Sequence, residues 1–237
     1  MPADSPIIDA RTIVARASSL ASLPEVVARV VALAEDPGAT ASQFEAVIGR
    51  DPALAARLLR IANSPYYSVT GQIDTIARAV TMVGTRHIRD LTLGLAAIRA
   101  FAGIPVALVS MEDFWVHSLY CAHLSRALAA DDLRLADTVF VGGLLHDIGQ
   151  LLLFIQQPEE SRQALWMVSE GPDHLTMDEA EREVLGVDHT EVGAELARQW
   201  LLPDALRECI AWHHQPERAS AANARAAAIV HVANSLA

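Results

Sequence analysis

The sequence has little of what marks several large classes of protein. Only two cysteines, Cys121 and Cys209, occur in 237 residues, and their separation fits neither a disulfide framework nor a zinc-binding pair. No apolar run approaches the ~18 residues that a membrane span needs, and the first residues do not form a signal peptide. These absences predict a soluble cytoplasmic protein without a membrane segment.

Aromatic residues are also scarce, at 5%, and β-branched residues do not alternate with polar ones as they do in strands. Apolar residues nevertheless make up 52% of the chain, with alanine and leucine prominent, so a sizeable core can form. The composition therefore predicts an all-α protein. A formal net charge of −11 argues against binding to a phosphate backbone as the main activity.

Apolar residues recur with the helical period along most of the chain, and capping residues mark several helix starts. "TASQFEAVIGR" (40–50) begins with Thr40 or Ser42 as the N-cap. "DPALAARLLRIANS" (51–64) places Asp51 at the N-cap and Pro52 at the first helical position.

A connection over 103–113 separates two halves of similar length, and "PYYSVTGQ" (65–72) predicts a loop. The second half predicts helices over 113–130, 137–156, 158–170, 177–185, 190–201, 204–215 and 221–237.

Six residues stand out as possible metal ligands: His117, His146, Asp147, His189, His213 and His214. Imidazoles and carboxylates are the side chains that divalent metals accept, and helices from distant parts of a bundle can bring them together. Each histidine alone is more often a hydrogen-bonded residue of a core or surface. The set as a whole favours a metal site.

The motifs "WVHS", "GLLHDIG", "DHTEVGAELARQWLLP" and "IAWHH", in this order, resemble the HDOD domain, a branch of the HD superfamily of metal-dependent phosphohydrolases. "LPEVVARVVALAED" and "VIGRDPALAARLLRIANSPYYS" resemble the family's N-terminal lobe. The resemblance covers 18–237 and implies an all-α fold, with an N-terminal helical lobe over 18–108 and an HD-like lobe over 109–237. Residues 1–17 are then an N-terminal extension, helical in part.

The resemblance also implies roles for individual residues. His117, His146 and Asp147 match the first metal ligands of catalytic HD proteins, and Asn234 stands where those proteins carry a carboxylate. His189, His213 and His214 match the additional histidines of the HD-GYP relatives, which hydrolyse cyclic dinucleotides with two or three metals. Asp113 matches a further acidic ligand of some of them, although its position also suits the first turn of a helix.

The departures from the catalytic pattern argue against hydrolysis. Asn234 is a neutral ligand, Gln150 replaces a lysine, and the glycine-rich GYP segment is absent. Two divalent cations would face only one clear carboxylate, Asp147, so Asp113, Asp188 or a bound anion would have to balance the charge. The sequence is compatible with one divalent cation (Fe, Mn, Zn or Mg) or with a metal-free hydrogen-bonded cluster.

The resemblance to the HDOD family implies a signalling module that acts through contacts with another protein or domain. Together with the departures from the catalytic pattern, it makes a non-catalytic bacterial signal-transduction domain the leading hypothesis. Two alternatives remain: a metal-dependent phosphohydrolase or phosphodiesterase, and a sensor that binds a nucleotide or anion without turning it over. The sequence leaves the partner and the oligomeric state open.

Overall fold

The computed structural model describes residues 9–17, 24–63, 72–101, 108–171 and 175–237. Within these ranges the regular structure is entirely helical, which confirms the predicted fold class. Most of the loop predicted over 65–72 lies outside the described residues.

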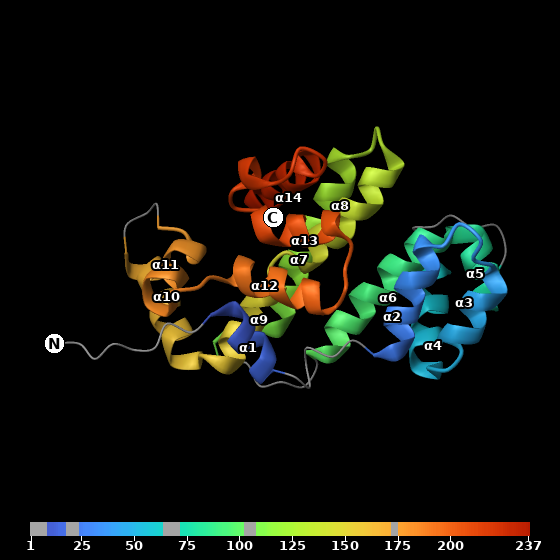
Figure 1. The fold of residues 1–237 in the computed structure, drawn as a ribbon, viewed down its shortest axis with the longest axis horizontal. Helices are drawn as coiled ribbons and strands as arrows, with labels where there is room; N and C mark the ends of the chain where they lie inside the picture. The colour runs from blue at the N-terminus through green and yellow to red at the C-terminus, as the bar shows by residue number, and fades with distance from the viewer. Residues whose placement is uncertain (1–8, 18–23, 64–71, 102–107, 172–174) are drawn as a thin grey trace. The chain divides into compact units, whose positions relative to one another are not determined.

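The chain divides into two compact units (Figure 1). Unit 1 is formed by the described parts of 1–22 and 103–237, and unit 2 by those of 23–102. Unit 2 contains α2 (Glu25–Glu35), α3 (Ala41–Ile48), α4 (Pro52–Ala62), α5 (Ile76–Val83) and α6 (Thr85–Ala100). Its core gathers apolar side chains of all five helices, among them Val30, Phe44, Ile48, Leu58, Val80 and Ile88.

Helix starts in unit 2 follow the predicted caps. The Thr40 side chain accepts a hydrogen bond from the backbone N–H of Gln43, and the Gln43 side chain accepts one from the backbone N–H of Thr40. The Asp51 side chain caps α4 by accepting hydrogen bonds from the backbone N–H groups of Ala53 and Leu54, with Pro52 in the first turn. These local bonds satisfy N–H groups that a helix cannot satisfy internally, which is why the sequence marks them well.

Unit 1 contains the helices on which the candidate ligands lie. They are α1 (Ala10–Arg16), α7 (Met111–Leu128), α8 (Leu133–Leu145), α9 (Ile148–Gln156), α10 (Pro158–Glu170), α11 (Met177–Leu185), α12 (His189–Gln199), α13 (Asp204–Trp212) and α14 (Ala224–Leu236), with a short 3₁₀ turn, η2 (Pro216–Arg218). Helices α7, α8, α13 and α14 share a core that includes Cys121, Val139, Cys209 and Val230. The α1 helix packs against α12 and α9 (Figure 1).

One predicted helix is wrong in extent. The apolar pattern predicts a continuous helix over 137–156, but the structure has two helices, α8 and α9, separated at His146 and Asp147. Residues 133–156 are long and apolar enough, by length and composition, to cross a membrane, yet 72% of their most apolar window is buried inside the fold. Both flanking helices are apolar because both lie in the core, so the period does not reveal the break between them.

Two glycines around this break allow helices to approach closely. A Cβ on Gly143 would lie 3.0 Å from the backbone of Ala122 in α7. A Cβ on Gly149 would lie 2.0 Å from the carbonyl oxygen of His189 and 2.5 Å from the backbone nitrogen of Gly193, both in α12. Only glycine fits where backbones meet at such distances, so "GGLLHDIG" places the His146–Asp147 pair between α7 and α12.

Replacing Gly149 by alanine should lower the free energy of unfolding by about 3 kcal/mol, because the added methyl overlaps the backbone of α12 rather than a movable side chain. Urea unfolding followed by circular dichroism measures this change. Gly38→Ala in an exposed turn of unit 2 is the control and should stay within about 0.5 kcal/mol of the unsubstituted protein. Equal stability of the two variants would contradict the close approach.

Candidate metal centre

The α8–α9 break positions the first two ligands. His146 is the C-cap residue of α8, and its Nδ1–H donates to the carbonyl oxygen of Gly143 at 2.8 Å, one of the carbonyls left free at a helix end. A carbonyl only accepts, so Nδ1 carries a proton and Nε2 of this fully buried imidazole faces the cluster. Asp147 follows at the start of α9.

The same local device recurs at the end of α13. His213 is the C-cap residue of that helix, and its Nδ1–H donates to the carbonyl oxygen of Ile210 at 2.9 Å. Its Nε2 therefore also faces the cluster, and His214 follows directly in the chain. Two separate helix ends thus fix the orientation of two imidazoles without using side chains from elsewhere.

His189 is oriented from a helix start instead. It is the first residue of α12, and both its backbone N–H and its Nδ1–H donate to Oε2 of Glu181, at 2.8 and 2.6 Å. The carboxylate satisfies an N–H group of the helix terminus and holds the ring in one orientation. Nε2 of His189 consequently faces His213 and His214.

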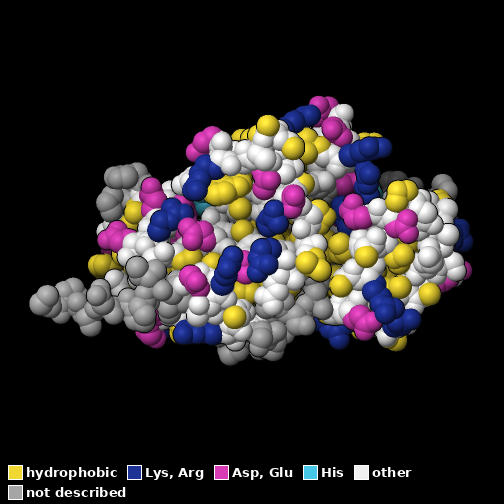
Figure 2. All heavy atoms as spheres, viewed as in Figure 1, with side chains coloured by type: hydrophobic (Ala, Val, Ile, Leu, Met, Phe, Trp, Pro, Cys, Tyr) yellow, Lys and Arg dark blue, Asp and Glu magenta, His cyan; other side chains and the backbone are white. Residues whose placement is uncertain are grey.

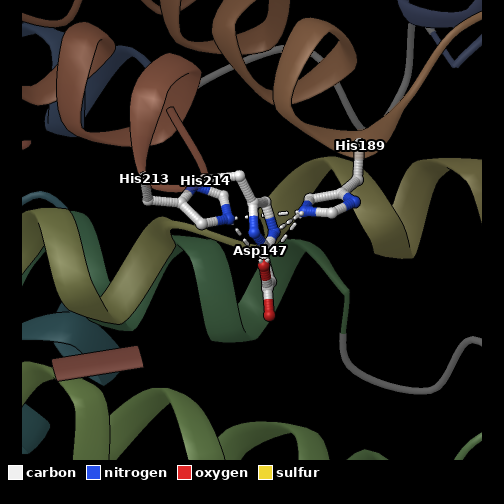
Figure 3. A group of neighbouring side chains, drawn as sticks. All are labelled: Asp147, His189, His213 and His214. Atoms are coloured by element: carbon white, nitrogen blue, oxygen red, sulfur yellow. Dashed lines mark hydrogen bonds and ion pairs between the residues drawn. The ribbon is translucent and has the colours of Figure 1, made fainter. Parts of the chain in front are cut away.

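Asp147 lies among these histidines, and Figure 3 shows it with His189, His213 and His214. Its Oδ1 lies 3.4 Å from Nε2 of His189 and 3.4 Å from Nε2 of His213. Its Oδ2 lies 3.1 Å from Nε2 of His146 and 3.8 Å from Nε2 of His117. One carboxylate is therefore shared by two groups of potential ligands.

We call these groups the His146 subsite and the His189 subsite. The His146 subsite comprises His117, His146, Asp147 and Asn234; the His189 subsite comprises Asp147, His189, His213 and His214.

Asn234, in α14, lies at the position that the sequence predicts for a weak ligand. Its Oδ1 is 3.0 Å from Nε2 of His117 and 3.2 Å from Nε2 of His146. Because Nε2 of His146 is unprotonated in the neutral ring, two acceptor atoms face each other here. A proton on the imidazole or a shared cation makes this arrangement favourable.

The donor set of the His189 subsite fits a divalent cation. Nε2 of His189 lies 3.4 Å from Nε2 of His213 and 3.2 Å from Nε2 of His214. When their rings are neutral, His189 and His213 each present a lone pair on Nε2, because Nδ1 carries the proton. Ligands at about 2.1 Å from a metal, in tetrahedral or octahedral geometry, lie about 3.0–3.4 Å from one another. The separations of the nitrogens are therefore those of a coordination sphere.

Burial keeps two of these imidazoles neutral. It lowers the pKa of His213 to about 4, and the hydrogen bond to Asp147 only partly opposes this effect. Burial, together with the neighbouring His213 and His189, lowers the pKa of His214 to about 3. Both rings are thus deprotonated at neutral pH, as metal coordination requires. The third ring differs: burial acts to lower the pKa of His189, but Glu181 and Asp147 outweigh it and raise that pKa, so a bound metal has to displace a proton there.

The ring of His146 behaves differently. Burial disfavours its charged form, but the adjacent carboxylate of Asp147 outweighs this and raises the pKa of His146 well above its ordinary value. The pKa of Asp147 is held well below the usual range: burial acts to raise it, and the histidines around it more than offset that effect. Asp147 is therefore ionised, as a ligand shared by both subsites has to be.

Two carboxylates that the sequence offered as charge compensation lie elsewhere. Asp113 is an exposed acid in the first turn of α7, whose N-cap is Ser110, and it belongs to neither subsite. Asp188 caps α12 and pairs with Arg182. The structure provides the negative charge from α11 instead, through Glu181 beside His189 and Asp178, whose Oδ1 is 3.8 Å from Nδ1 of His214.

Sequence patterns did not single out Asp178 or Glu181. Both lie near the start of a helix rich in charged residues, where acids usually face solvent and favour the helix dipole. Their i, i+3 spacing just upstream of "DH" is the one signal available, and it is weak.

A pocket of about 580 Å³ adjoins the His189 subsite. His214 and Asp178 lie in its wall, which α1, α11, α12, α13 and η2 complete. Its lining includes five arginines: Arg11, Arg182, Arg198, Arg207 and Arg218. In Figure 2, Arg and acidic side chains are interspersed on the visible face of unit 1 around a small exposed patch of histidine.

Fold and cluster together define the class: a helical domain with a His–Asp centre of the HD type. Within that class the chain belongs to the HDOD domain family, whose model matches residues 20–216.

Similar structures agree with this family. A Geobacter sulfurreducens HDOD domain protein of unknown function is 28% identical, with a TM-score of 0.78 over 95% of this chain and 76% of that one. A provisionally assigned phosphohydrolase from Shewanella amazonensis SB2B is 26% identical, with a TM-score of 0.78 over 94% and 79%.

Two further relatives are longer than this chain. A provisionally assigned signal transduction protein from Marinobacter aquaeolei VT8 is 26% identical, with a TM-score of 0.72 over 91% of this chain and 48% of that one. A Treponema pallidum (strain Nichols) protein is 26% identical over 210 residues, which are 86% of this chain and 39% of the relative. The chain thus spans less than half of either.

In the metal-free protein, the ring of His213 should stay neutral down to about pH 5 and titrate near 4. Ring ¹⁵N chemical shifts followed against pH measure this directly. The unfolded chain binds the same proton near pH 6.5, so the contribution of His213 to stability is complete above 6.5 and is lost as the pH falls towards 4. His213→Asn should reduce that loss, whereas a ring that titrates near 6.5 would contradict the effect of burial.

Proposed function

We propose that this protein is a non-catalytic signal-transduction domain of the bacterial cytoplasm, with a divalent cation that holds its helices in a defined arrangement. The observation that carries the proposal is Asn234: its amide oxygen lies 3.0 and 3.2 Å from the imidazoles of His117 and His146. An amide is neutral and a weaker ligand than a carboxylate. The only negative charge among the ligands of the His146 subsite is then that of Asp147, which the His189 subsite shares.

The ligands come from separate parts of unit 1, which supports a structural role for the cation. They lie on α7, at the α8–α9 break, at the start of α12, at the end of α13 and on α14. A cation in the His146 subsite would join α7, the α8–α9 break and α14, and one in the His189 subsite would join the same break to α12 and α13. Whatever binds the folded form alone stabilises it, so loss of the cation would loosen the packing of these helices.

The output of such a domain would be contact with another protein or domain. Helix α7 carries His117 and next to it exposes the apolar side chains of Val116, Leu119 and Tyr120, the last 61% exposed. Apolar residues grouped at i, i+3 and i+4 on one helix face are suited to protein contacts. A change at the His146 subsite would act on this helix directly.

Metal analysis of tag-free protein tests the metal centre. We expect at least one divalent cation per chain. Asp147→Ala removes the shared ligand and should lose all bound metal, His146→Ala should lose the ion of the His146 subsite, and Asp113→Asn, the control outside both subsites, should retain the metal. Chelation of the unsubstituted protein should lower its melting temperature. A metal-free protein whose melting temperature does not respond to added metal would overturn the proposal.

Hydrolysis assays on a phosphomonoester and on cyclic dinucleotides, with Mn²⁺, Fe²⁺ or Mg²⁺, test the absence of catalysis. We expect no turnover by the unsubstituted protein and tighter metal binding by Asn234→Asp, which restores an anionic ligand. Turnover by the unsubstituted protein that His146→Ala abolishes would identify a phosphohydrolase instead.

The arginine-lined pocket favours a second candidate, a sensor that binds an anion or nucleotide. Each guanidinium has five N–H donors suited to phosphate or carboxylate, and the pocket adjoins His214. Inorganic phosphate added in calorimetry should then bind, and Arg207→Gln with Arg218→Gln should weaken binding at least tenfold. Arg162→Gln on α10 is the control. Absence of heat with phosphate and with nucleotides would exclude the sensor.

A further inference from the structure

The His189 subsite is short of negative charge within its own ligand set. It offers three imidazoles and only one oxygen of Asp147, whose other oxygen faces the His146 subsite. A divalent cation there would keep most of its charge uncompensated in a buried environment, at a cost of several kcal/mol. Additional carboxylates close behind the imidazoles would remove that cost.

Glu181 is one such carboxylate. Its side chain is fully buried, and its Oε2 accepts hydrogen bonds from the backbone N–H and the Nδ1–H of His189. Its Oε1 is buried and has no hydrogen-bond partner among the described residues. A buried carboxyl oxygen without a hydrogen-bond partner is unfavourable unless positive charge lies nearby.

Asp178 lies behind His214, but at a longer distance and without a hydrogen bond to the ring. It lies three residues before Glu181 on α11, so both acids lie on the same face of that helix. Its side chain is 5% exposed, and its Oδ1 lies 3.8 Å from Nδ1 of His214 and has no hydrogen-bond partner among the described residues. The repeated observation is a buried, incompletely satisfied carboxylate behind an imidazole.

Arg182, next to Glu181 in the chain, forms its ion pairs with Asp188 and Glu191 rather than with either of these acids. The described residues therefore place no guanidinium in an ion pair with Asp178 or Glu181. The positive charge near these two acids would come from the histidines or from a cation that the histidines bind.

We propose that Asp178 and Glu181 are positioning residues of the His189 subsite, and that this acidic pair on α11 determines whether the domain holds a second divalent cation. A cation on Nε2 of His189 would polarise the ring and strengthen its Nδ1–H as a donor to Glu181. Asp178, 3.8 Å from Nδ1 of His214, would act through its charge. Glu181 thus orients its ring, and both acids balance the added charge. This inference rests on the metal centre proposed above.

Titration of the metal-free full chain with Zn²⁺, followed by calorimetry and elemental analysis, tests the proposal. The unsubstituted protein should bind two Zn²⁺. Glu181→Gln and Asp178→Asn should each bind the second ion about 10–100-fold more weakly while the first is retained. Glu183→Gln is the matched control, because it removes one negative charge from an exposed position of the same helix.

A second measurement separates charge from damage to the fold. The melting temperature of each metal-free variant and the ring ¹⁵N shifts of His146, in the other subsite, should match the unsubstituted protein. If Glu181→Gln does not fold, Asp178→Asn alone tests the proposal, because the side chain of Asp178 lies in the pocket wall.

The outcomes distinguish this inference from the proposed function. Two ions retained with unchanged affinity in both variants, or one ion only in the unsubstituted protein, would overturn the role of α11 and leave the metal centre standing. No bound ion in any variant would overturn both.

Discussion

The carboxylate of Asp147 faces histidines on both sides, and most of unit 1 is arranged around this one group. Its Oδ1 meets His189 and His213, and its Oδ2 meets His146. A buried anion needs compensating charge, and two kinds of imidazole surround this one. Neighbouring carboxylates outweigh burial and raise the pKa of His146 and of His189, whereas burial keeps His213 and His214 neutral. A divalent cation bound here would displace the protons of the first two rings and meet the lone pairs of the other two.

The imidazoles are oriented by hydrogen bonds that involve backbone groups at helix ends. His146 and His213 each end a helix and bond a carbonyl of its last turn, while His189 begins a helix whose free N–H is accepted by Glu181. Helix ends leave such groups unsatisfied in every protein. Here they orient ligands, so the same bonds serve the stability of the helices and the geometry of the site.

Much of this could be predicted from sequence, for identifiable reasons. The cap at Asp51 is local and was predicted correctly, and of the two caps predicted for the helix before it, Thr40 and Ser42, the structure has Thr40. The six possible ligands were singled out by residue type and order, and the fold brings them together. The break at His146 was missed because the helices on both sides are apolar. Asp178 and Glu181 were missed because only the tertiary fold turns that acidic face inward. Whether the cluster holds metal depends on charge balance in three dimensions.

The place of α1 has a consequence for how the chain folds during synthesis. This helix comes first in the sequence, yet it packs on α9 and α12, more than 130 residues later, with the whole of unit 2 between them. On the ribosome, the helices of unit 2 emerge before the partners of α1 exist. The helices of unit 2 contact one another across shorter sequence separations than α1 does with α9 and α12. We therefore expect unit 2 to fold first and α1 to remain without its docking site until α12 has been translated.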